Sequence, residues 1–446
     1  MKKALKAANA AMHNAASYEE WRQAAAEYDR LTGMDEWKAE DYSPDYNYRG
    51  LQARVEEIRR LRRDKDVVKL AFTLNEGLHG NIDNMANPSL YTYAKLGTKH
   101  LITEYLREVS SALDWICDND FEELPFDQKM RFFQRTGRSF GRSALMLSGG
   151  ATLGMFHIGV LKATFEAGLL PRVLSGSSAG SIIGGAIGTH SDEDLVKMFD
   201  PDYLTLQAWR GLGVWGAIRE RAIMDGQQLS DCLHDNIGDM TFEEAFEYTG
   251  RIINITVSAA DQHQQGRMLN YLTSPHVLIR SASLASCAVP GVFPPVELQA
   301  KDVNGRVVPY MPGRRWLDGS VESDLPMLRL SRMHNVNHYI VSQTNPHVVP
   351  FLTKKDRPQE RGLMPFAKDM VSTTSRNTLK LARRHMGPNV VSNMIGKLHS
   401  ITDQKYSGDI NIYPHNQTRK LLMVIANPTP KDIEDFIAEG ERATWP

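Results

Sequence analysis

The residue of this sequence best suited to chemistry is Ser178, at the centre of Gly176-Ser177-Ser178-Ala179-Gly180. The segment fits the pattern G-x-S-x-G and stands where a short apolar run changes into a helix-like stretch. A serine on such a tight turn needs neighbours with minimal side chains, which Gly176 and Gly180 provide. The following helix directs its N-terminal dipole at the hydroxyl. A small-residue turn without chemistry has the same composition, but the strand-turn-helix setting favours a nucleophilic serine.

A second candidate segment is the glycine-rich turn at Gly149, Gly150 and Ala151, which directly follows an apolar run at 143–147. Consecutive glycines let main-chain N–H groups approach an anionic oxygen without obstruction, and a helix that begins there adds its dipole. A phosphate-binding turn has a similar composition. The Gly-Lys-Ser/Thr ending of a P-loop and the G-x-G-x-x-G spacing are both missing, however. An oxyanion hole is therefore favoured over a nucleotide site.

A candidate base is Asp318, in Trp316-Leu317-Asp318-Gly319-Ser320, where a carboxylate follows an apolar pair as at a strand end. An aspartate before glycine is commonly a plain turn residue, but beside the two other motifs it is the leading candidate to activate Ser178. A histidine base, as in a Ser-His-Asp triad, remains an alternative, because several histidines follow in the chain. These are His334, His338, His347, His385, His399 and His415.

The elements expected around these motifs alternate between strand and helix. Apolar runs predict strands at 143–147, 173–174, 252–257, 338–342 and 421–425. Helical patterns follow the first two runs, and this order is typical of a parallel sheet covered by helices. Residues 17–140 have a helical pattern instead, which begins with the capping box Ser17-Tyr-Glu-Glu20. A helix expected at 51–74 has a basic face, suited either to solvent or to lipid headgroups.

Together the motifs resemble those of the patatin-like phospholipase family. That family has a glycine-rich oxyanion loop, a G-x-S-x-G elbow and an Asp-Gly-Gly/Ala motif, and residues 148–154, 176–180 and 318–319 match them in order and spacing. Residues 281–295 resemble the family's Ala-Ser-x-Ala-x-Pro-x-x-Phe-Pro-Pro segment. The resemblance covers residues 140–345 and implies an α/β fold, a three-layer sandwich around a mostly parallel sheet.

Carried over by position, the resemblance assigns Ser178 as nucleophile and Asp318 as general base. It gives the oxyanion hole to the main-chain amides of Gly149, Gly150 and Ala151. Ala151 and Leu153 stand where the family usually has a third glycine and a basic residue, which favours neutral glycerides over phosphate headgroups. Ser320 stands where glycine or alanine is usual, and this small change is not expected to disturb the carboxylate.

The flanking segments resemble the triacylglycerol lipase branch of that family, found in yeast and plants. Residues 17–115 are similar to the helical domain that precedes the patatin domain there, and the ending 440–446 is similar as well. We therefore expect a helical N-terminal domain at 1–140 and a patatin-like catalytic domain at 141–345. A C-terminal extension at 346–446 is expected to pack on the catalytic domain.

An acyl chain needs an apolar trough, and two segments are candidates for its walls. Substrate-binding residues are expected in the proline-rich segment after Cys287, namely Val289, Pro290, Phe293 and Pro294. The aromatic-rich stretch from Leu204 to Ile218, with Trp209 and Trp215, is a candidate for a cover. Ordinary core packing explains both segments equally well.

The composition limits the partners. Of 446 residues, 42% are hydrophobic and 24% charged, and 52 Lys plus Arg nearly balance 53 Asp plus Glu, so no nucleic-acid partner is expected. Three scattered cysteines have neither disulfide nor metal-site spacing, which fits a reducing compartment. We expect a cytoplasmic protein, peripherally associated with membranes or lipid droplets, that needs no metal or cofactor. The sequence indicates no oligomeric state.

These residues lead to one main hypothesis and two alternatives. The main one is a lipid acyl hydrolase, of the triacylglycerol lipase or phospholipase A type, that cleaves carboxylic esters through a Ser-Asp dyad and an acyl-enzyme. An acyl-CoA-independent acyltransferase would use the same acyl-enzyme with an alcohol as acceptor. A non-catalytic module that binds lipid surfaces is the other alternative.

Overall fold

The computed structural model describes residues 1–78, 80–201, 203, 207–213, 222–261, 264–346, 348–349, 406–414, 423–424 and 426–446. They form two compact units, residues 1–142 with Trp445 and Pro446, and residues 143–444. Within these ranges, no helix is both long enough and apolar enough to cross a membrane. The strand expected at 421–425 lies largely outside the described residues.

The first unit is built from helices, as the sequence predicted. They are α1 (Lys2–Asn14), α2 (Tyr18–Thr32), α3 (Met34–Ala39), α4 (Tyr48–Arg63), α5 (Val67–Gly77), α6 (His100–Asp118) and α7 (Phe126–Phe140), with 3-10 turns η1 (Ile82–Asn84) and η2 (Pro88–Tyr91). Ser17 caps α2 by accepting from the Glu20 N–H at 3.3 Å. The Glu20 carboxylate accepts from the N–H of Ala16 at 2.9 Å and not from that of Ser17, so the predicted capping box is only half formed.

The basic face of α4 lies against acidic residues of α6. Arg59 pairs with Glu104 at 2.6 Å and with Glu108 at 3.0 Å, and Arg62 pairs with Glu108 at 3.4 Å. The opposite stripe of α4 is buried in the core of this unit and consists of Leu51, Val55, Ile58 and Leu61. Because part of the basic face already has protein partners, the structure gives no support to its use for lipid headgroups.

The second unit contains a seven-stranded sheet with the order β4-β3-β2-β1-β8-β9, in which β7 also pairs with β3. Its strands are β1 (Arg142–Leu147), β2 (Val173–Gly176), β3 (Ile252–Ala259), β4 (Arg267–Leu269), β7 (Trp316–Asp318), β8 (Val336–Ser342) and β9 (Ile410–Ile412). The pairs β1–β2, β2–β3 and β8–β9 are parallel, whereas β4 and β7 run antiparallel to β3. The strands predicted at 143–147, 173–174, 252–257 and 338–342 are confirmed.

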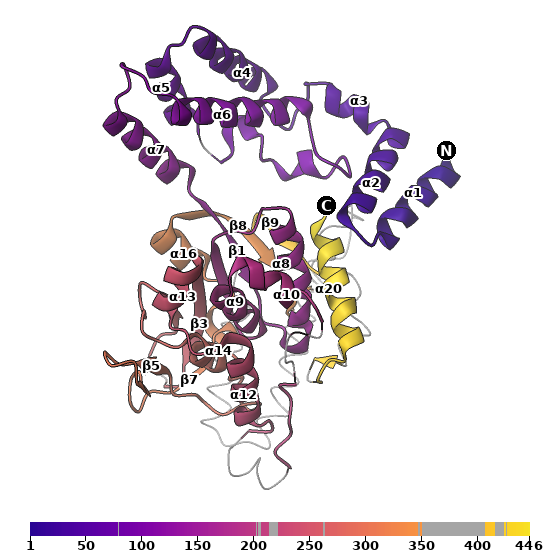
Figure 1. Ribbon diagram of the computed structural model, residues 1–446. Helices are drawn as coiled ribbons and strands as arrows, with labels where there is room; N and C mark the ends of the chain where they lie inside the picture. Colours follow the sequence, from indigo (N-terminus) through magenta and orange to yellow (C-terminus); the bar gives the residue numbers. More distant parts are fainter. Residues whose placement is uncertain are drawn as a thin grey trace. The chain divides into compact units, whose positions relative to one another are not determined.

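Helices cover both faces of this sheet (Figure 1). They are η3 (Ala151–Met155), α8 (Phe156–Glu166), α9 (Ala179–Thr189), α10 (Asp192–Met198), α12 (Gly226–Ile237), α13 (Phe242–Thr249), α14 (Ile279–Ser286), α15 (Ser320–Ser323), α16 (Met327–His334) and α20 (Pro430–Thr444). Along β1, Leu145 and Leu147 belong to one core, with α8, α9 and α20, while Ala144 and Met146 belong to a second core with α16. The α/β three-layer arrangement is therefore as predicted, and both faces of the central strands are buried.

The last helix, α20, belongs to this second unit and lies along α8 (Figure 1). Two glycines permit the close approach. A Cβ on Gly159 of α8 would lie 2.0 Å from the Ile437 carbonyl oxygen, and a Cβ on Gly440 of α20 would lie 2.3 Å from that of Phe156. Any side chain there would push the two helices apart. The C-terminal segment thus completes the core beside the first strand and helix.

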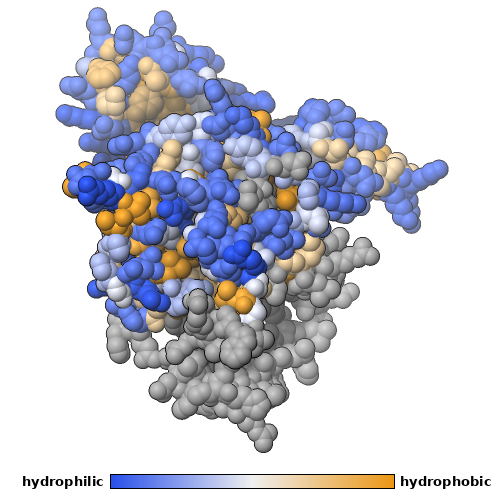
Figure 2. Space-filling view, turned by 60° about the horizontal axis from the view of Figure 1, so that its bottom comes forward, coloured by the Kyte–Doolittle hydropathy of each residue, from blue (hydrophilic) through white to orange (hydrophobic). Residues whose placement is uncertain are grey.

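A small hairpin, β5 (Gln299–Lys301) and β6 (Val307–Pro309), stands apart from the main sheet. Its turn residue Val303 is fully exposed, at 101%, and Val307 is exposed as well. On the face shown in Figure 2, hydrophobic residues form separate patches among hydrophilic ones.

Candidate active site

Ser178 occupies a strained turn between β2 and α9. Its φ of 49° and ψ of −125° are uncommon for a residue with a side chain. The flanking glycines are required by contact, because a Cβ on Gly176 would lie 2.3 Å from the Gly180 carbonyl oxygen and one on Gly180 would lie 2.2 Å from that of Leu147. The Ser178 N–H donates to the Ser286 hydroxyl at 2.9 Å. The turn therefore presents the serine side chain at the N-terminus of α9.

Asp318 ends β7 and is held beside β3, opposite Val257. The next residue has to be glycine, because a Cβ on Gly319 would lie 2.1 Å from the Thr256 carbonyl oxygen. The carboxylate is buried, and its Oδ1 accepts from the Ser320 N–H at 2.8 Å and from the Ser320 hydroxyl at 2.7 Å. Its Oδ2 accepts a hydrogen bond from none of the described residues. One carboxylate oxygen is thus fixed and the other is open.

The pKa of Asp318 reflects its position. Burial raises this pKa from 3.8 to about 6, against the opposing effects of the Ser320 hydrogen bonds and of the nearby Ser178 hydroxyl. The charge of Asp324 adds to the increase. Contacts also bring the predicted pair into one site. A Cβ on Gly149 would lie 3.3 Å from the Ser178 Cβ and 3.6 Å from the Ser320 Cβ, and the Ser320 hydroxyl bonds to Asp318. A carboxylate with a raised pKa is a stronger base than an exposed aspartate.

The glycine-rich turn passes directly beside the serine, since a Cβ on Gly149 would lie 3.3 Å from the Ser178 Cβ. The three predicted oxyanion residues differ in their hydrogen bonds. The Gly149 N–H donates to Oδ1 of Asp324 at 3.0 Å, so this amide is already occupied. The N–H groups of Gly150 and Ala151 donate to no group in the described part of the chain. Ala151 has a φ of 50°, which turns the main chain sharply at this point.

Sequence reasoning missed a further open amide, that of Ala179. It is the first residue of α9, and its N–H has no acceptor among the described residues. The residue after a nucleophilic serine is a common oxyanion donor in hydrolases with a G-x-S-x-G elbow, and this rule would have identified it. The open donors beside Ser178 therefore come from two loops.

The main-chain turn is supported from behind by His157. Its Nε2 donates to the Ser148 carbonyl oxygen at 2.9 Å, which leaves Nδ1 to accept from the Ser342 hydroxyl at 2.7 Å. Burial lowers the pKa of His157 to about 4, so the imidazole is neutral near pH 7. No motif signalled this structural role.

No described histidine hydrogen-bonds Ser178 or Asp318. His334 bonds to Asn254 at 2.9 Å, and His338 bonds to Ser143 at 3.0 Å. The other histidines named above, His347, His385, His399 and His415, lie outside the described residues. The triad alternative thus finds no imidazole in the described site.

Ser178 opens into a cavity of about 70 Å³. Hydrophobic side chains dominate its wall, which is lined by Ala151, Thr152, Met155, Ser178, Ala179, Ile182, Ala208, Trp209, Leu229, Cys232, Cys287, Val289, Phe293 and Pro428. The Trp209 indole packs against the Phe293 ring in a tilted arrangement, with ring centroids 5.6 Å apart, and its N–H donates to the Thr152 hydroxyl at 2.9 Å. An acyl chain next to the serine would find an apolar surface here.

The predicted substrate-binding residues divide into two groups. Val289 and Phe293 line the cavity, whereas Pro290 and Pro294 do not. Pro294 lies instead near the first turn of α12, where a Cβ on Gly226 would approach it to 3.5 Å. Of the predicted cover, Trp209 lines the wall, and residues 204–206 and 214–218 lie outside the described residues.

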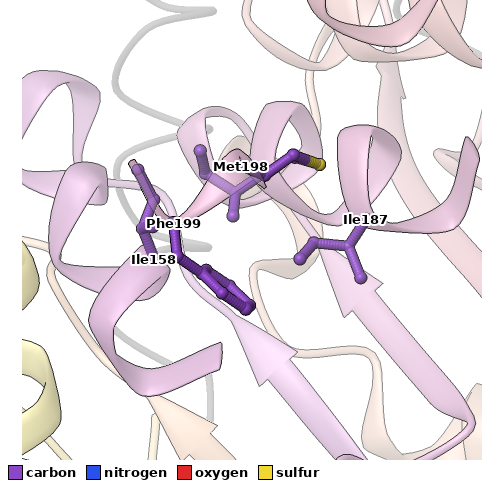
Figure 3. Close-up of a pocket in the computed structure, with 5 residues that line it drawn as sticks. Ile158, Ile187, Met198 and Phe199 are labelled. Atoms are coloured by element: carbon purple, nitrogen blue, oxygen red, sulfur yellow. The ribbon is translucent and has the colours of Figure 1, made fainter. Parts of the chain in front are cut away.

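A second, smaller cavity of about 10 Å³ lies between α8, α9 and α10. Figure 3 shows its lining side chains, among them Ile158, Ile187, Met198 and Phe199, directed toward a common gap. All of them are apolar, and none is a group that could react or bind a polar ligand. This cavity is an imperfection of core packing and plays no part in the site.

Comparison with known proteins agrees with this geometry. Residues 145–330 match the family described as patatin-like phospholipase, and residues 1–138 match a domain of unknown function (DUF3336). The chain is 37% identical to triacylglycerol lipase SDP1L of Arabidopsis thaliana over 97% of its own length and 55% of that protein. It is 35% identical to triacylglycerol lipase 4 of Saccharomyces cerevisiae, over 97% and 50%. It is also 35% identical to triacylglycerol lipase ptl3 of Schizosaccharomyces pombe, over 97% and 92%.

The site combines a buried carboxylate, a strained serine, open main-chain amides and an apolar cavity. The chain belongs to the patatin-like phospholipase family. It spans about half the length of the Arabidopsis and Saccharomyces relatives and most of the length of the Schizosaccharomyces one.

Proposed function

We propose that this protein is a lipid acyl hydrolase that cleaves the carboxylic esters of glycerides through Ser178 and Asp318. The observation that carries the proposal is the open Oδ2 of Asp318, a buried oxygen with raised proton affinity that lies within interaction range of the serine hydroxyl. A serine hydroxyl needs such a base as it attacks a carbonyl carbon. The relatives named triacylglycerol lipases support the same activity.

The first half of the reaction forms an acyl-enzyme. The Ser178 oxygen attacks the ester carbonyl carbon while its proton moves to Oδ2 of Asp318. The negative charge that develops on the carbonyl oxygen is stabilised by the open N–H groups of Gly150, Ala151 and Ala179. A single donor of this kind is worth about 3–4 kcal/mol. When the intermediate collapses, Asp318 returns the proton to the leaving alcohol, and the acyl group stays on Ser178.

The second half of the reaction repeats these steps with water. A water molecule attacks the acyl carbon and gives its proton to Asp318, and the same amides bind the second oxyanion. Collapse releases the fatty acid and returns the proton to Ser178. None of these steps calls on a metal ion or an organic cofactor.

The substrate we propose is a neutral glyceride. The cavity wall around Ser178 is almost entirely apolar. No basic side chain is among the lining residues, so a phosphate headgroup would find no counter-charge at this wall. An ester flanked by hydrocarbon fits this surface better than a charged phospholipid.

We propose that the protein acts as a cytoplasmic enzyme that attaches peripherally to membranes or lipid droplets. Its substrates do not dissolve in water, so the protein must reach a lipid surface. The hydrophobic patches seen in Figure 2 support short-lived contacts of this kind. Flotation of the purified protein with triglyceride droplets tests this localisation.

The proposed activity is tested with purified wild type and Ser178→Ala on triglyceride, diglyceride, phospholipid and lysophospholipid substrates. We expect fatty-acid release from glycerides by the wild type and none by Ser178→Ala, with equal thermal unfolding of the two proteins. Addition of an acceptor alcohol should not divert most of the acyl group. Transfer to the acceptor as the main product would instead identify an acyltransferase.

A further inference from the structure

Asp324 is a second buried carboxylate next to the site, and the steps proposed above do not use it. Its side chain is only 1% exposed. Oδ1 accepts a hydrogen bond from the Gly149 N–H at 3.0 Å and another from the Ser177 hydroxyl. Gly149 directly precedes the open amides of Gly150 and Ala151, and Ser177 directly precedes the nucleophile. One carboxylate oxygen therefore connects the oxyanion loop to the nucleophile elbow.

This connection lies where small displacements matter most. Oxyanion donors act at about 2.7–3.1 Å from the charged oxygen, and a shift of about 1 Å removes most of their effect. The oxyanion loop follows β1 and the elbow follows β2, so the two loops are not joined by a continuous segment. The carbonyl oxygen of Gly149 accepts a hydrogen bond from the Thr344 hydroxyl at 3.3 Å. The N–H of Gly149 bonds to Asp324, and through this carboxylate the oxyanion loop is joined to the nucleophile elbow.

We propose that Asp324 is a positioning residue that holds the open amides of the oxyanion loop in register with Ser178. The inference rests on the proposed function, because it concerns the same ester hydrolysis. The geometry behind it is the pair of hydrogen bonds that one carboxylate oxygen accepts from the two loops. As a secondary effect, the charge of Asp324 adds to the raised pKa of Asp318.

The surroundings of Asp324 agree with this role. Burial raises its pKa to about 6, against the opposing effects of the Ser177 and Gly149 hydrogen bonds, and the Asn345 side chain also bonds to it. Among the described residues, the titratable groups that its charge affects are Asp318 and Tyr406, whose pKa values it raises. Above about pH 6 the carboxylate is therefore charged while it bridges the two loops.

The test compares Asp324→Asn with Asp324→Ala in the full chain, using a soluble short-chain ester. Asparagine keeps an acceptor oxygen and removes the charge, whereas alanine removes both. We expect Asp324→Ala to lower kcat about 100-fold, the effect of one lost oxyanion donor, with little change in KM. Asp324→Asn should retain more kcat than Asp324→Ala. The acid limb of its pH–rate profile, where activity rises as Asp318 loses its proton, should move to lower pH. The reason is that the charge that raises the pKa of Asp318 is gone.

Two further variants make the result specific. Ser177→Ala removes one of the two bonds and should lower kcat less than Asp324→Ala does. Asp29→Asn changes an equally buried aspartate of the helical unit, which is paired with Lys38 at 2.9 Å, and should reduce thermal stability without moving the acid limb.

The proposal is overturned if Asp324→Ala folds and keeps a wild-type kcat. It is also overturned if Asp324→Asn loses activity with an unmoved acid limb. If Asp324→Ala does not fold, the pH profile of Asp324→Asn decides alone. Failure of the proposed function looks different, because then the wild type is inactive or Ser178→Ala remains active.

Discussion

Ser320 donates two hydrogen bonds to the same oxygen of Asp318, from its main-chain N–H at 2.8 Å and from its hydroxyl at 2.7 Å. Both bonds stabilise the charged carboxylate and lower its pKa, and they direct the other oxygen, Oδ2, away from Ser320. The hydroxyl adds a second donor, since glycine or alanine at this position would offer only the main-chain N–H.

We expect Ser320→Ala to move the acid limb of kcat/KM to higher pH. Loss of a hydrogen bond that favours the charged form raises the pKa of Asp318, and a protonated Asp318 cannot act as base. Ser320→Thr keeps the hydroxyl and serves as the matched control, with its limb close to that of the wild type. A pH–rate profile with a soluble ester measures both, and an unmoved limb in Ser320→Ala would contradict the assignment.

The buried carboxyl of Asp318 should weaken the fold at neutral pH. Its pKa in the folded protein, about 6, lies above its ordinary value of 3.8. The protonated carboxyl stabilises the folded state, and this contribution is complete below the ordinary pKa. It is lost as the pH rises through about 6 and the buried group ionises. Asp318→Asn should be inactive yet more stable than the wild type near pH 8, by up to about 3 kcal/mol.

Denaturant unfolding at two pH values measures this effect. The gain in the free energy of unfolding should shrink toward zero at about pH 3, below the ordinary pKa, where the wild-type carboxyl is mostly protonated in both states. Ser178→Ala is the control, because it is inactive but keeps the carboxyl and so should show no such gain. An Asp318→Asn variant that loses the same stability at both pH values would show that burial of the charge is not costly here.

Gly159→Ala should separate α8 from α20 and destabilise the second unit. The new Cβ would meet main-chain atoms of Ile437, which cannot move aside as a flexible side chain can. A loss of about 2–3 kcal/mol is expected, the usual effect of overpacking. Gly184→Ala is the control, since its Cβ would have only an ordinary contact of 3.7 Å with Leu147. Thermal unfolding of both variants decides the matter, and equal melting temperatures would contradict the close packing.

Val289→Trp should change the preference for acyl length. Val289 lines the cavity next to Ser178 and is 37% exposed, so a larger side chain can fill the space without breaking the core. We expect kcat/KM to fall more for a long-chain ester than for a short-chain ester. Val303→Trp, on the fully exposed hairpin turn, is the control for a surface tryptophan. If the ratio of kcat/KM for the long-chain ester to that for the short-chain ester stays at the wild-type value, the acyl chain does not lie beside Val289.

Much of the catalytic unit was predictable because its information is local. A tight turn demands small residues around Ser178, and a strand end demands a glycine after Asp318, so both motifs are visible in the chain itself. The apolar runs of β1, β2, β3 and β8 are likewise long enough to show their buried character. Three-residue strands such as β4 and β9 carry no periodic pattern and were not predicted as strands, whereas the end of β7 was expected from the apolar pair before Asp318.

The contacts between distant segments were not predictable. Asp324 bridges Gly149 and Ser177, and nothing in its neighbouring residues signals a partner so far away in sequence. The hydrogen bond of the Gly149 N–H was missed for the same reason. The sequence of a glycine-rich loop does not indicate which of its N–H groups are bonded in the folded chain. Pro290 and Pro294 lie in the expected segment, but only the folded chain determines that Val289 and Phe293 face the cavity.

The most direct test of the account is the rate at which a fluorophosphonate labels Ser178, measured by mass spectrometry of the intact protein and its peptides. The account predicts one adduct on Ser178 in the wild type, none in Ser178→Ala, and labelling of Asp318→Asn slower by about 100-fold or more, the usual contribution of a general base. Labelling of Asp318→Asn at the wild-type rate, or an adduct on another residue, would contradict a dyad of Ser178 and Asp318.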